Sequence, residues 1–467
     1  MNTKLQNDAL AIWNAGVEAV KPAQLFRDQI HVRGSKLLFQ NGEAVDLKEF
    51  EGITVVGAGK AAAAMTVAFV QQILPALRIQ LPHLIVRGWI NCPEGSIPDI
   101  SSLPDLSTET KSSAEQIRLF AARPAGINIP TPQAVVGTKK ILELVSHSPP
   151  THLVLCLLSG GGSALLSAPC DGIDLEEKQA IAELIAAAGG NIEQLNAVRR
   201  ALSRVKAGGL ARACGSKKLV TLVLSDVLGD PLETIASGPT FTSIQPDAEA
   251  AIQALDALGL FKHPRLENVI RVLTVQAEQG ETEKNGPSNV KHVILGNNAI
   301  AVEAAAAKAQ RLGFEVASES ATQCEGDVHI LAKHAAIMCR DLKSKQVRSC
   351  WISGGEPTVQ LPADAGKGGR NQQLCLSVLH ELKSEINHDG SGFIFLSGGT
   401  DGEDGPTDAA GAWIDSVVLQ KALSKELKIE DYLQRANAYE FFQRTGSLLL
   451  SGPTGTNVCD LRVAVCS

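Results

Sequence analysis

The chain has 467 residues, of which 44% are hydrophobic and 20% are charged, as in ordinary soluble globular proteins. Such a length exceeds a single hydrophobic core and favours two domains, while a net charge of −7 without a long basic run argues against nucleic acid and anionic membranes as partners. The N-terminus lacks the apolar core of a signal peptide, and no run reaches the ~18 apolar residues of a membrane helix. The ten cysteines form no C-x-x-C pair. We therefore expect a cytoplasmic protein with reduced cysteines.

Residues 4–20 have the periodicity of an amphipathic helix. After them an apolar run, a loop of small residues and a helix alternate repeatedly, which predicts strands at 53–56, 83–86, 153–158, 219–224, 293–295, 349–352 and 393–396. This alternation is typical of α/β proteins with parallel sheets of βαβ units. A polar stretch at 276–290 interrupts it, so we expect two α/β domains, at 1–285 and 286–467.

The first glycine loop, Gly57–Ala62, fits the G-x-G-x-x-A form of the dinucleotide fingerprint. However, no acidic residue lies between Glu51 and Glu94, where a ribose partner would be expected. Lys60 is predicted to lie at a helix N-terminus, where a phosphate or carboxylate is favoured. The alternative is a tight turn that carries a solvated lysine.

Ser159–Ser163 contains three consecutive glycines after an apolar strand, and such loops expose backbone N–H groups that bind phosphate. A flexible turn is the alternative. The loop is not a Walker A loop, since the sequence contains no G-x-x-x-x-G-K-[ST].

Two segments supply carboxylates at the predicted ends of strands. Asp226 follows the strand at 219–224 and could hold Mg²⁺, accept a hydroxyl proton or cap a turn. The loop Ser397–Asp408 carries four glycines and three aspartates, a composition that suits a hard cation. The predicted metal ligands are therefore Asp226, Asp230, Asp401 and Asp404.

Arg370 lies in a glycine-rich approach, Gly366–Gln372, to a helix expected at 374–382. An arginine at such a place suits a carboxylate or a transferring phosphoryl group, although a surface arginine is the commoner outcome. The polar loop Ser451–Asn457 could contact a nucleotide phosphate, or be an ordinary turn. None of the ten histidines lies in a catalytic motif, and we find neither a nucleophile elbow nor a metal-spaced Cys/His cluster.

Taken together, these segments resemble the glycerate 2-kinases whose chains end in a MOFRL domain. The matching segments run in order through most of the chain: 57–61, 158–164, 203–209, 225–230, 236–240, 354–358, 369–372, 399–411 and 452–457. One departure is Ile129-Pro-Thr-Pro132, which keeps the two prolines of the family's H-P-x-P segment but lacks its histidine.

The resemblance implies ATP-dependent phosphorylation of D-glycerate at its 2-hydroxyl, with Mg²⁺ on the ATP. It also implies a larger Rossmann-like N-terminal domain, a smaller MOFRL-type C-terminal domain and an active-site cleft between them. The implied catalytic residues are Lys60, Arg370 and Asp226. The implied phosphate and substrate contacts are Gly57, Gly59, Ser159, Gly160, Gly161, Gly162, Ser163, Glu356, Asn371, Thr400, Thr454, Thr456 and Asn457.

Two other functional classes are compatible with the loops. The G-x-G-x-x-A match suggests an NAD(P)H-dependent reductase of hydroxypyruvate or tartronate semialdehyde, against which the missing acidic ribose partner argues. A non-catalytic sugar-acid or nucleotide sensor is the other, but several predicted loops carry Asp, Lys and Arg together, which favours chemistry. A homo-oligomer is compatible with the sequence, which does not specify the oligomeric state.

Overall fold

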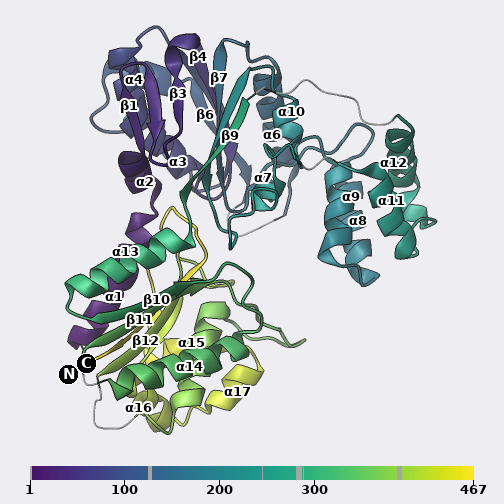
Figure 1. Ribbon diagram of the computed structural model, residues 1–467. Helices are drawn as coiled ribbons and strands as arrows, with labels where there is room; N and C mark the ends of the chain where they lie inside the picture. The colour runs from purple at the N-terminus through teal and green to yellow at the C-terminus, as the bar shows by residue number, and fades with distance from the viewer. Residues whose placement is uncertain are drawn as a thin grey trace. The chain divides into compact units, whose positions relative to one another are not determined.

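The computed structural model describes residues 3–124, 129–243, 246–279, 287, 289–345, 347–386 and 392–467, and these form two compact units (Figure 1). The C-terminal unit consists of Met1–Leu25, Leu224–Asp230 and Gly296–Ser467, and the N-terminal unit of Phe26–Val223 and Pro231–Leu295. The domain boundary expected between residues 285 and 286 lies outside the described residues. The compact units differ from the predicted division at the start of the chain, because residues 3–25 pack with the C-terminal part.

The N-terminal unit contains a six-stranded sheet of order β6-β5-β4-β7-β8-β9. The three pairs β4/β5, β4/β7 and β5/β6 are parallel, as the βαβ pattern predicts. Each predicted strand of this part is present, although the strand expected at 83–86 runs further along the chain. The strands are β4 (Gly52–Ala58), β5 (Ile85–Pro93), β6 (Ile117–Arg123), β7 (His152–Ser159), β8 (Lys218–Leu224) and β9 (Asn289–Gly296).

Helices and a small antiparallel sheet complete the N-terminal unit. The small sheet has the order β1-β2-β3 (Ile30–Arg33, Lys36–Phe39, Ala44–Asp46). Four of the helices, α8, α9, α11 and α12, share a hydrophobic core of their own. The helices are α2 (Pro22–Gln29), α3 (Ala62–Ala68), α4 (Leu74–Gln80), α5 (Thr108–Ala114), α6 (Pro132–Ser146), α7 (Gly162–Leu165), α8 (Leu175–Ala187), α9 (Ile192–Ala201), α10 (Gly209–Arg212), α11 (Ala248–Ala257) and α12 (Glu267–Gln279), with short helical turns at Leu47–Glu49, Ile100–Ser102, Ile235–Ser237 and Pro264–Leu266.

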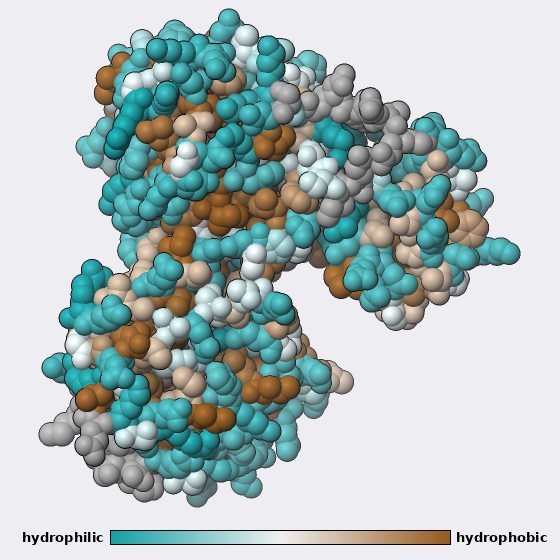
Figure 2. All heavy atoms as spheres, in the orientation of Figure 1, coloured by the Kyte–Doolittle hydropathy of each residue, from teal (hydrophilic) through white to brown (hydrophobic). Residues whose placement is uncertain are grey.

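Helices α3 and α4 are joined through a π-helical turn, Phe69–Ile73, into one helical stretch, Ala62–Gln80. By length and composition only, this stretch is apolar enough to cross a membrane, and it is the one such helix among the described residues. In its most apolar window 56% of the residues are buried, and Met65, Phe69 and Leu77 belong to the core of the unit. Core helices of ordinary globular proteins meet the same criteria. On the face shown in Figure 2, hydrophilic side chains cover most of the surface of both units.

The C-terminal unit contains a mixed sheet of order β10-β11-β15-β12-β13-β14, where a parallel sheet was predicted. The prediction is wrong here because β15 inserts between β11 and β12 and runs antiparallel to both. The strands are β10 (Glu315–Ser320), β11 (Ser349–Gly355), β12 (Phe393–Gly399), β13 (Gly411–Ile414), β14 (Leu448–Leu449) and β15 (Asp460–Cys466).

Helices cover both faces of this sheet (Figure 1). On one face α1 (Thr3–Ala19) and α13 (Asn298–Arg311) pack on Leu461, Val463 and Val465 of β15. The alternate residues Ala464 and Cys466 face the opposite core, as the period of two in a strand requires. The helices on that side are α14 (Val328–Ser344), α15 (Arg370–Leu382), α16 (Ser416–Ser424), α17 (Ile429–Gln434) and α18 (Ala438–Thr445).

Candidate functional site

Two loops at the carboxyl ends of β4 and β7 are docked against each other in the N-terminal unit. The backbone N–H of Lys60 donates to the carbonyl of Gly160 at 2.8 Å, and that of Ala61 donates to the Ser159 hydroxyl at 3.0 Å. Gly59 has φ +146°, and a Cβ there would lie 2.0 Å from Ser159 Oγ, so only glycine fits. This docking places half-buried Lys60 directly before α3, as predicted.

Parts of these loops are engaged within the protein. Ser159 is fully buried, and its hydroxyl already accepts the N–H of Ala61. Gly57 lies inside β4, where a Cβ would meet the carbonyl of Leu157 at 2.2 Å. Both residues therefore shape the loop. Contact with a phosphate stays a prediction for them and for Gly160, Gly161 and Gly162.

A cluster of cations surrounds the last residue of the Ser159–Ser163 loop. The ammonium of Lys206 donates to the hydroxyls of Ser163 and Ser237, the latter at 2.8 Å, and Arg199 Nη2 donates to Ser163 at 3.3 Å. The two hydroxyls lie 3.0 Å apart. Burial, together with the charges of Arg199 and Lys178, lowers the pKa of Lys206 well below its ordinary value. The arrangement is rich in donors and carries excess positive charge.

In the C-terminal unit, Arg370 begins α15 and is held by two carboxylates. Its Nε and Nη2 donate to the two carboxyl oxygens of Asp460 at 2.7 and 3.0 Å, and its Nη1 lies 2.8 Å from Glu356. Burial alone would lower the pKa of Arg370, but the charges of Asp460 and Glu356 raise it above its ordinary value. Burial raises the pKa of Glu356. The predicted residues Arg370 and Glu356 are thus in direct contact.

Asp226 joins the same group of residues through Cys459. The thiol of Cys459 donates to the backbone carbonyl of Asp226 at 3.0 Å and to Glu356 at 3.8 Å. Burial, together with nearby carboxylates, raises the pKa of this thiol, so that it remains a protonated donor. Asn457 Nδ2 lies 3.4 Å from the carboxylate of half-buried Asp226. The structure therefore brings together Asp226, Glu356, Arg370 and Asn457, which we call the carboxylate cluster together with Asp460.

Asp404, a predicted metal ligand, caps the first turn of α15. Its two oxygens accept the backbone N–H groups of Asn371 and Gln372 at 3.0 and 2.9 Å, and Asn371 Nδ2 adds a third bond. Gly369, the N-cap residue, has no side chain to do this, and a Cβ there would collide with Asp404. Burial raises the pKa of Asp404 to about 7. Its geometry fits capping, and metal binding by it stays a prediction.

The threonines of the two polar loops bond mainly within the unit. Thr400 donates to the carbonyl of Cys459 at 2.6 Å, Thr454 to the carbonyl of Thr400 at 2.6 Å, and Thr456 to the carbonyl of Val20 at 2.6 Å. Thr400 and Thr456 are buried, whereas Thr454 is half-exposed. Their predicted phosphate contacts stay predictions, and Thr454 is the one of the three that solvent reaches most easily.

The two other predicted metal ligands have partners as well. Asp230 accepts a hydrogen bond from Asn297 Nδ2 at 2.6 Å, and Asp401 accepts one from the backbone N–H of Glu403 at 3.1 Å. Over the part of the chain that the structure describes, no three His, Cys, Asp or Glu side chains are grouped as a metal site. A magnesium ion that arrives on ATP needs only one or two carboxylates, because phosphate oxygens and water supply its other ligands.

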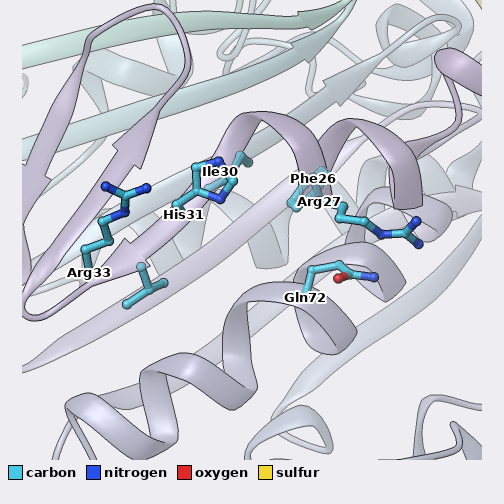
Figure 3. Close-up of a pocket in the computed structure, with 7 residues that line it drawn as sticks. Phe26, Arg27, Ile30, His31, Arg33 and Gln72 are labelled. Carbon is cyan, nitrogen blue, oxygen red and sulfur yellow. The ribbon is translucent and has the colours of Figure 1, made fainter.

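A separate surface pocket of about 270 Å³ lies between α2, β1 and the π-helical turn (Figure 3). Its lining includes Arg27, His31, Arg33 and Gln72. None of the predicted site residues lines it, and we assign it no role in the chemistry.

Comparisons with known proteins identify the family of the chain. Residues 8–274 match a family described as a domain of unknown function, DUF4147, and residues 349–460 match the MOFRL family. A glycerate kinase of Danio rerio is 35% identical over 510 residues, which cover 99% of this chain and 97% of the relative. The chain belongs to the glycerate kinase family.

Two comparisons with Thermotoga maritima extend this result. A D-glycerate 2-kinase is 36% identical over 350 residues, which cover 74% of this chain and 80% of the relative. The crystal structure of a glycerate kinase superposes with a TM-score of 0.78 at 29% identity, covering 99% of this chain and 100% of that one. Membership in the glycerate kinase family confirms the resemblance and the two-domain α/β class, and the names of these relatives give no support to a reductase.

Sequence reasoning gave no role to several residues that the geometry of this family member brings forward. Lys206 and Ser237 lie in the segments 203–209 and 236–240, which match the family. No residue of these segments was predicted to be functional, because their small residues are also typical of ordinary turns. Cys459 and Asp460 follow the polar loop at 451–457. In both cases the sequence held a signal, because Lys206 and Ser237 lie within two residues of a glycine and Cys459 and Asp460 follow a glycine-containing polar loop.

Proposed function

We propose that this chain transfers the γ-phosphoryl group of ATP to the 2-hydroxyl of D-glycerate, giving 2-phosphoglycerate and ADP. Family membership supports the kinase class, and the carboxylate cluster is the single structural observation that carries the proposal. The cluster combines a fixed guanidinium with half-buried carboxylates, and a phosphoryl transfer site needs both a group that neutralises charge and a group that accepts a proton. MgATP is the co-substrate.

Lys60 and Arg370 stabilise the charge that spreads over the phosphoryl oxygens during transfer. Arg370 cannot turn away from its place, because Asp460 holds two of its nitrogens. A fixed cation needs little reorganisation at the moment of reaction, which is the main advantage of a preorganised site. Lys60 lies on the loop whose backbone docks against Gly160.

Asp226 is the proposed proton acceptor. In the transfer, the glycerate oxygen forms a bond to the γ-phosphorus, the bond from that phosphorus to the bridging oxygen breaks, and the hydroxyl proton passes to the Asp226 carboxylate. ADP leaves with the electron pair of the broken bond. Asn457 orients the carboxylate through its amide group. The magnesium of MgATP supplies charge neutralisation when bound, and Asp226 is the predicted ligand whose surroundings best allow contact with it.

Other parts of the proposal rest on the sequence alone. We propose a cytoplasmic location, with D-glycerate and ATP as small-molecule partners and without nucleic acid or membrane as partners. The expectation that residues of both units serve one reaction in a shared cleft stays a prediction. The division of ligand contacts among the predicted loops is also part of the proposal.

The test is an assay with purified protein, D-glycerate and MgATP, in which ADP release is coupled to NADH oxidation. Phosphorus–proton NMR of the product then identifies the phosphorylated carbon. We expect 2-phosphoglycerate. A product phosphorylated only at C3 would contradict the regiochemistry, and absence of ADP with every sugar acid would overturn the class. NADH consumption with hydroxypyruvate, measured without coupling enzymes, would instead revive the reductase.

A further inference from the structure

The cations around Ser163 form a cluster whose positive charge is not balanced by any carboxylate among the described residues. Arg199 on α9 and Lys206 both donate to Ser163, and Lys206 also donates to Ser237. Within the described ranges no carboxylate charge acts on either cation: burial acts on Arg199, and the charges that act on Lys206 are those of Arg199, Lys178 and Arg200. Buried cations are normally paired, so this cluster calls for an anion from outside. We call Lys178, Arg199, Lys206, Ser163 and Ser237 the cationic cluster.

The backbone around the cluster is held in an unusual conformation. Ala236 and Ser237 have φ of 51° and 65°, and Ala207 has φ 47°, all in the left-handed region that residues other than glycine rarely adopt. Two backbone bonds, Ala207 N–H to Ser237 carbonyl and Gly208 N–H to Gly238 carbonyl, lock the two turns together at 3.0 and 2.7 Å. Such strain is costly and is found mainly where a side chain must be held at a functional position. Here it holds Lys206 and Ser237 side by side.

A count of donors and acceptors shows what the cluster lacks. With Lys206 charged, Ser163 accepts two hydrogen bonds, from Arg199 and Lys206, so both of its lone pairs are used. Ser163 must therefore donate the hydrogen bond that it shares with Ser237, and the hydroxyl hydrogen of Ser237 is left without an acceptor among the described residues. The third N–H of Lys206 has no acceptor within the described part of the chain either. All remaining groups are donors, so the missing partner is an acceptor.

Lys178 on α8 gives independent support. It is 8% exposed, and its ammonium nitrogen is buried without a hydrogen-bond partner in the part of the chain that is described. Arg199 is among the charges that act on it. Ser163, Ser237 and Arg199 are only half-buried, so the cluster can be reached from solvent, with the two ammonium groups lying deeper.

We propose that the cationic cluster binds the carboxylate of the acceptor substrate, an inference that rests on the proposed glycerate kinase activity. A carboxylate supplies acceptors without donors, and it makes strong charge-assisted hydrogen bonds with cationic donors. The triphosphate of ATP would bring Mg²⁺, and the cluster offers that ion no carboxylate. The hydroxyls of Ser163 and Ser237 and the guanidinium of Arg199 contact the substrate carboxylate. The buried ammonium groups of Lys178 and Lys206 add positive electrostatic potential at this position. This site makes the enzyme select 2-hydroxy acids over uncharged polyols.

The experiment compares Lys206→Met with the matched control Lys139→Met, an exposed lysine on α6 of the same unit. Calorimetric titration measures binding of D-glycerate, of its neutral amide glyceramide, and of a non-hydrolysable ATP analogue with Mg²⁺. The wild type and the control should bind glycerate more tightly than glyceramide. In Lys206→Met the affinity for glycerate should fall about 10- to 100-fold, while the affinities for glyceramide and the ATP analogue stay unchanged.

Arg199→Gln provides a second variant at the half-exposed edge of the cluster, in case the buried substitution impairs folding. It should raise the KM for glycerate with little change in the KM for ATP, and Lys206→Arg should retain part of the lost affinity because it keeps the charge. Unchanged glycerate binding in both Lys206→Met and Arg199→Gln overturns the inference, and so does loss of the ATP analogue with glycerate binding retained, which would assign the cluster to a phosphate.

The binding measurements separate this inference from the proposed function. If the wild type binds glycerate through Lys206 but forms no ADP, the carboxylate site stands and the kinase activity fails. If the enzyme makes 2-phosphoglycerate while Lys206→Met keeps its glycerate affinity, the kinase activity stands and the carboxylate site fails.

Discussion

Replacing Arg370 by Met tests whether the carboxylate cluster is a structural unit as well as a reactive one. The side chain of Asp460 is 0% exposed, and both of its oxygens accept hydrogen bonds from Arg370. Removing one partner of a buried ion pair typically costs about 3–5 kcal/mol, because the other charge is left without compensation. A unit of this size loses about 2–4 °C for each kcal/mol, so we expect the thermal midpoint to fall by about 10 °C.

The assay is thermal unfolding followed by circular dichroism, and the matched control is Arg311→Met, which replaces an exposed arginine at the end of α13. The control should change the free energy of unfolding by less than about 0.5 kcal/mol. The double variant with Asp460→Asn should recover most of the stability, since the buried charge is gone, while remaining inactive if Arg370 acts on the phosphoryl group. A midpoint for Arg370→Met within about 2 °C of the wild type would refute the reasoning from the buried pair.

Three further outcomes are expected. Lys60→Ala should lower kcat/KM by about 10²-fold with little change in the thermal midpoint, because Lys60 is half-buried on a loop; near-normal steady-state kinetics would remove it from the mechanism. Asp226→Asn should impair turnover, and a magnesium titration of this variant separates the two proposed roles of Asp226. Partial rescue by magnesium indicates metal binding. No rescue, together with a flattened acidic limb of the pH–rate profile, indicates proton transfer. Burial lowers the pKa of Lys178 from 10.5 to about 8. Between these two pH values the unfolded chain therefore binds more protons than the folded chain, so Lys178 makes the free energy of unfolding rise with pH over that range. Lys178→Met should therefore be more stable than the wild type at pH 7 in chemical denaturation, with a smaller rise above pH 8; a less stable variant would contradict this.

The parts of the fold that depend on local pattern were predictable from the sequence. The strands at 53–56, 153–158 and 219–224 and the helix after Arg370 are confirmed, because apolar runs and glycine turns act over a few residues. The position of β15 was not predictable, since pairing of Asp460–Cys466 with β11 and β12 depends on contacts distant in sequence.

The same distinction explains the site. Arg370 was recognised from its local glycines, but its partner Asp460 is 90 residues away, so the buried ion pair could not be predicted from the local sequence. Asp404 lies in a loop whose composition suits a metal, while the structure uses it to cap a helix that begins after Gly369. The charge imbalance around Lys206 arises only when α8, α9 and two turns come together.

The placement of α1 and β15 has a consequence for biosynthesis. Both pack in one core of the C-terminal unit, where Ile12 and Trp13 share a cluster with Val463 and Val465. Ribosomes add about 5–20 residues per second, so the apolar face of α1 must wait on the order of 20–90 s before the strand that completes its core emerges. The six-stranded sheet of the N-terminal unit needs no strand after β9 (Asn289–Gly296) and can form meanwhile. Chaperones that shield an exposed helix should therefore engage the first residues of the nascent chain throughout its synthesis.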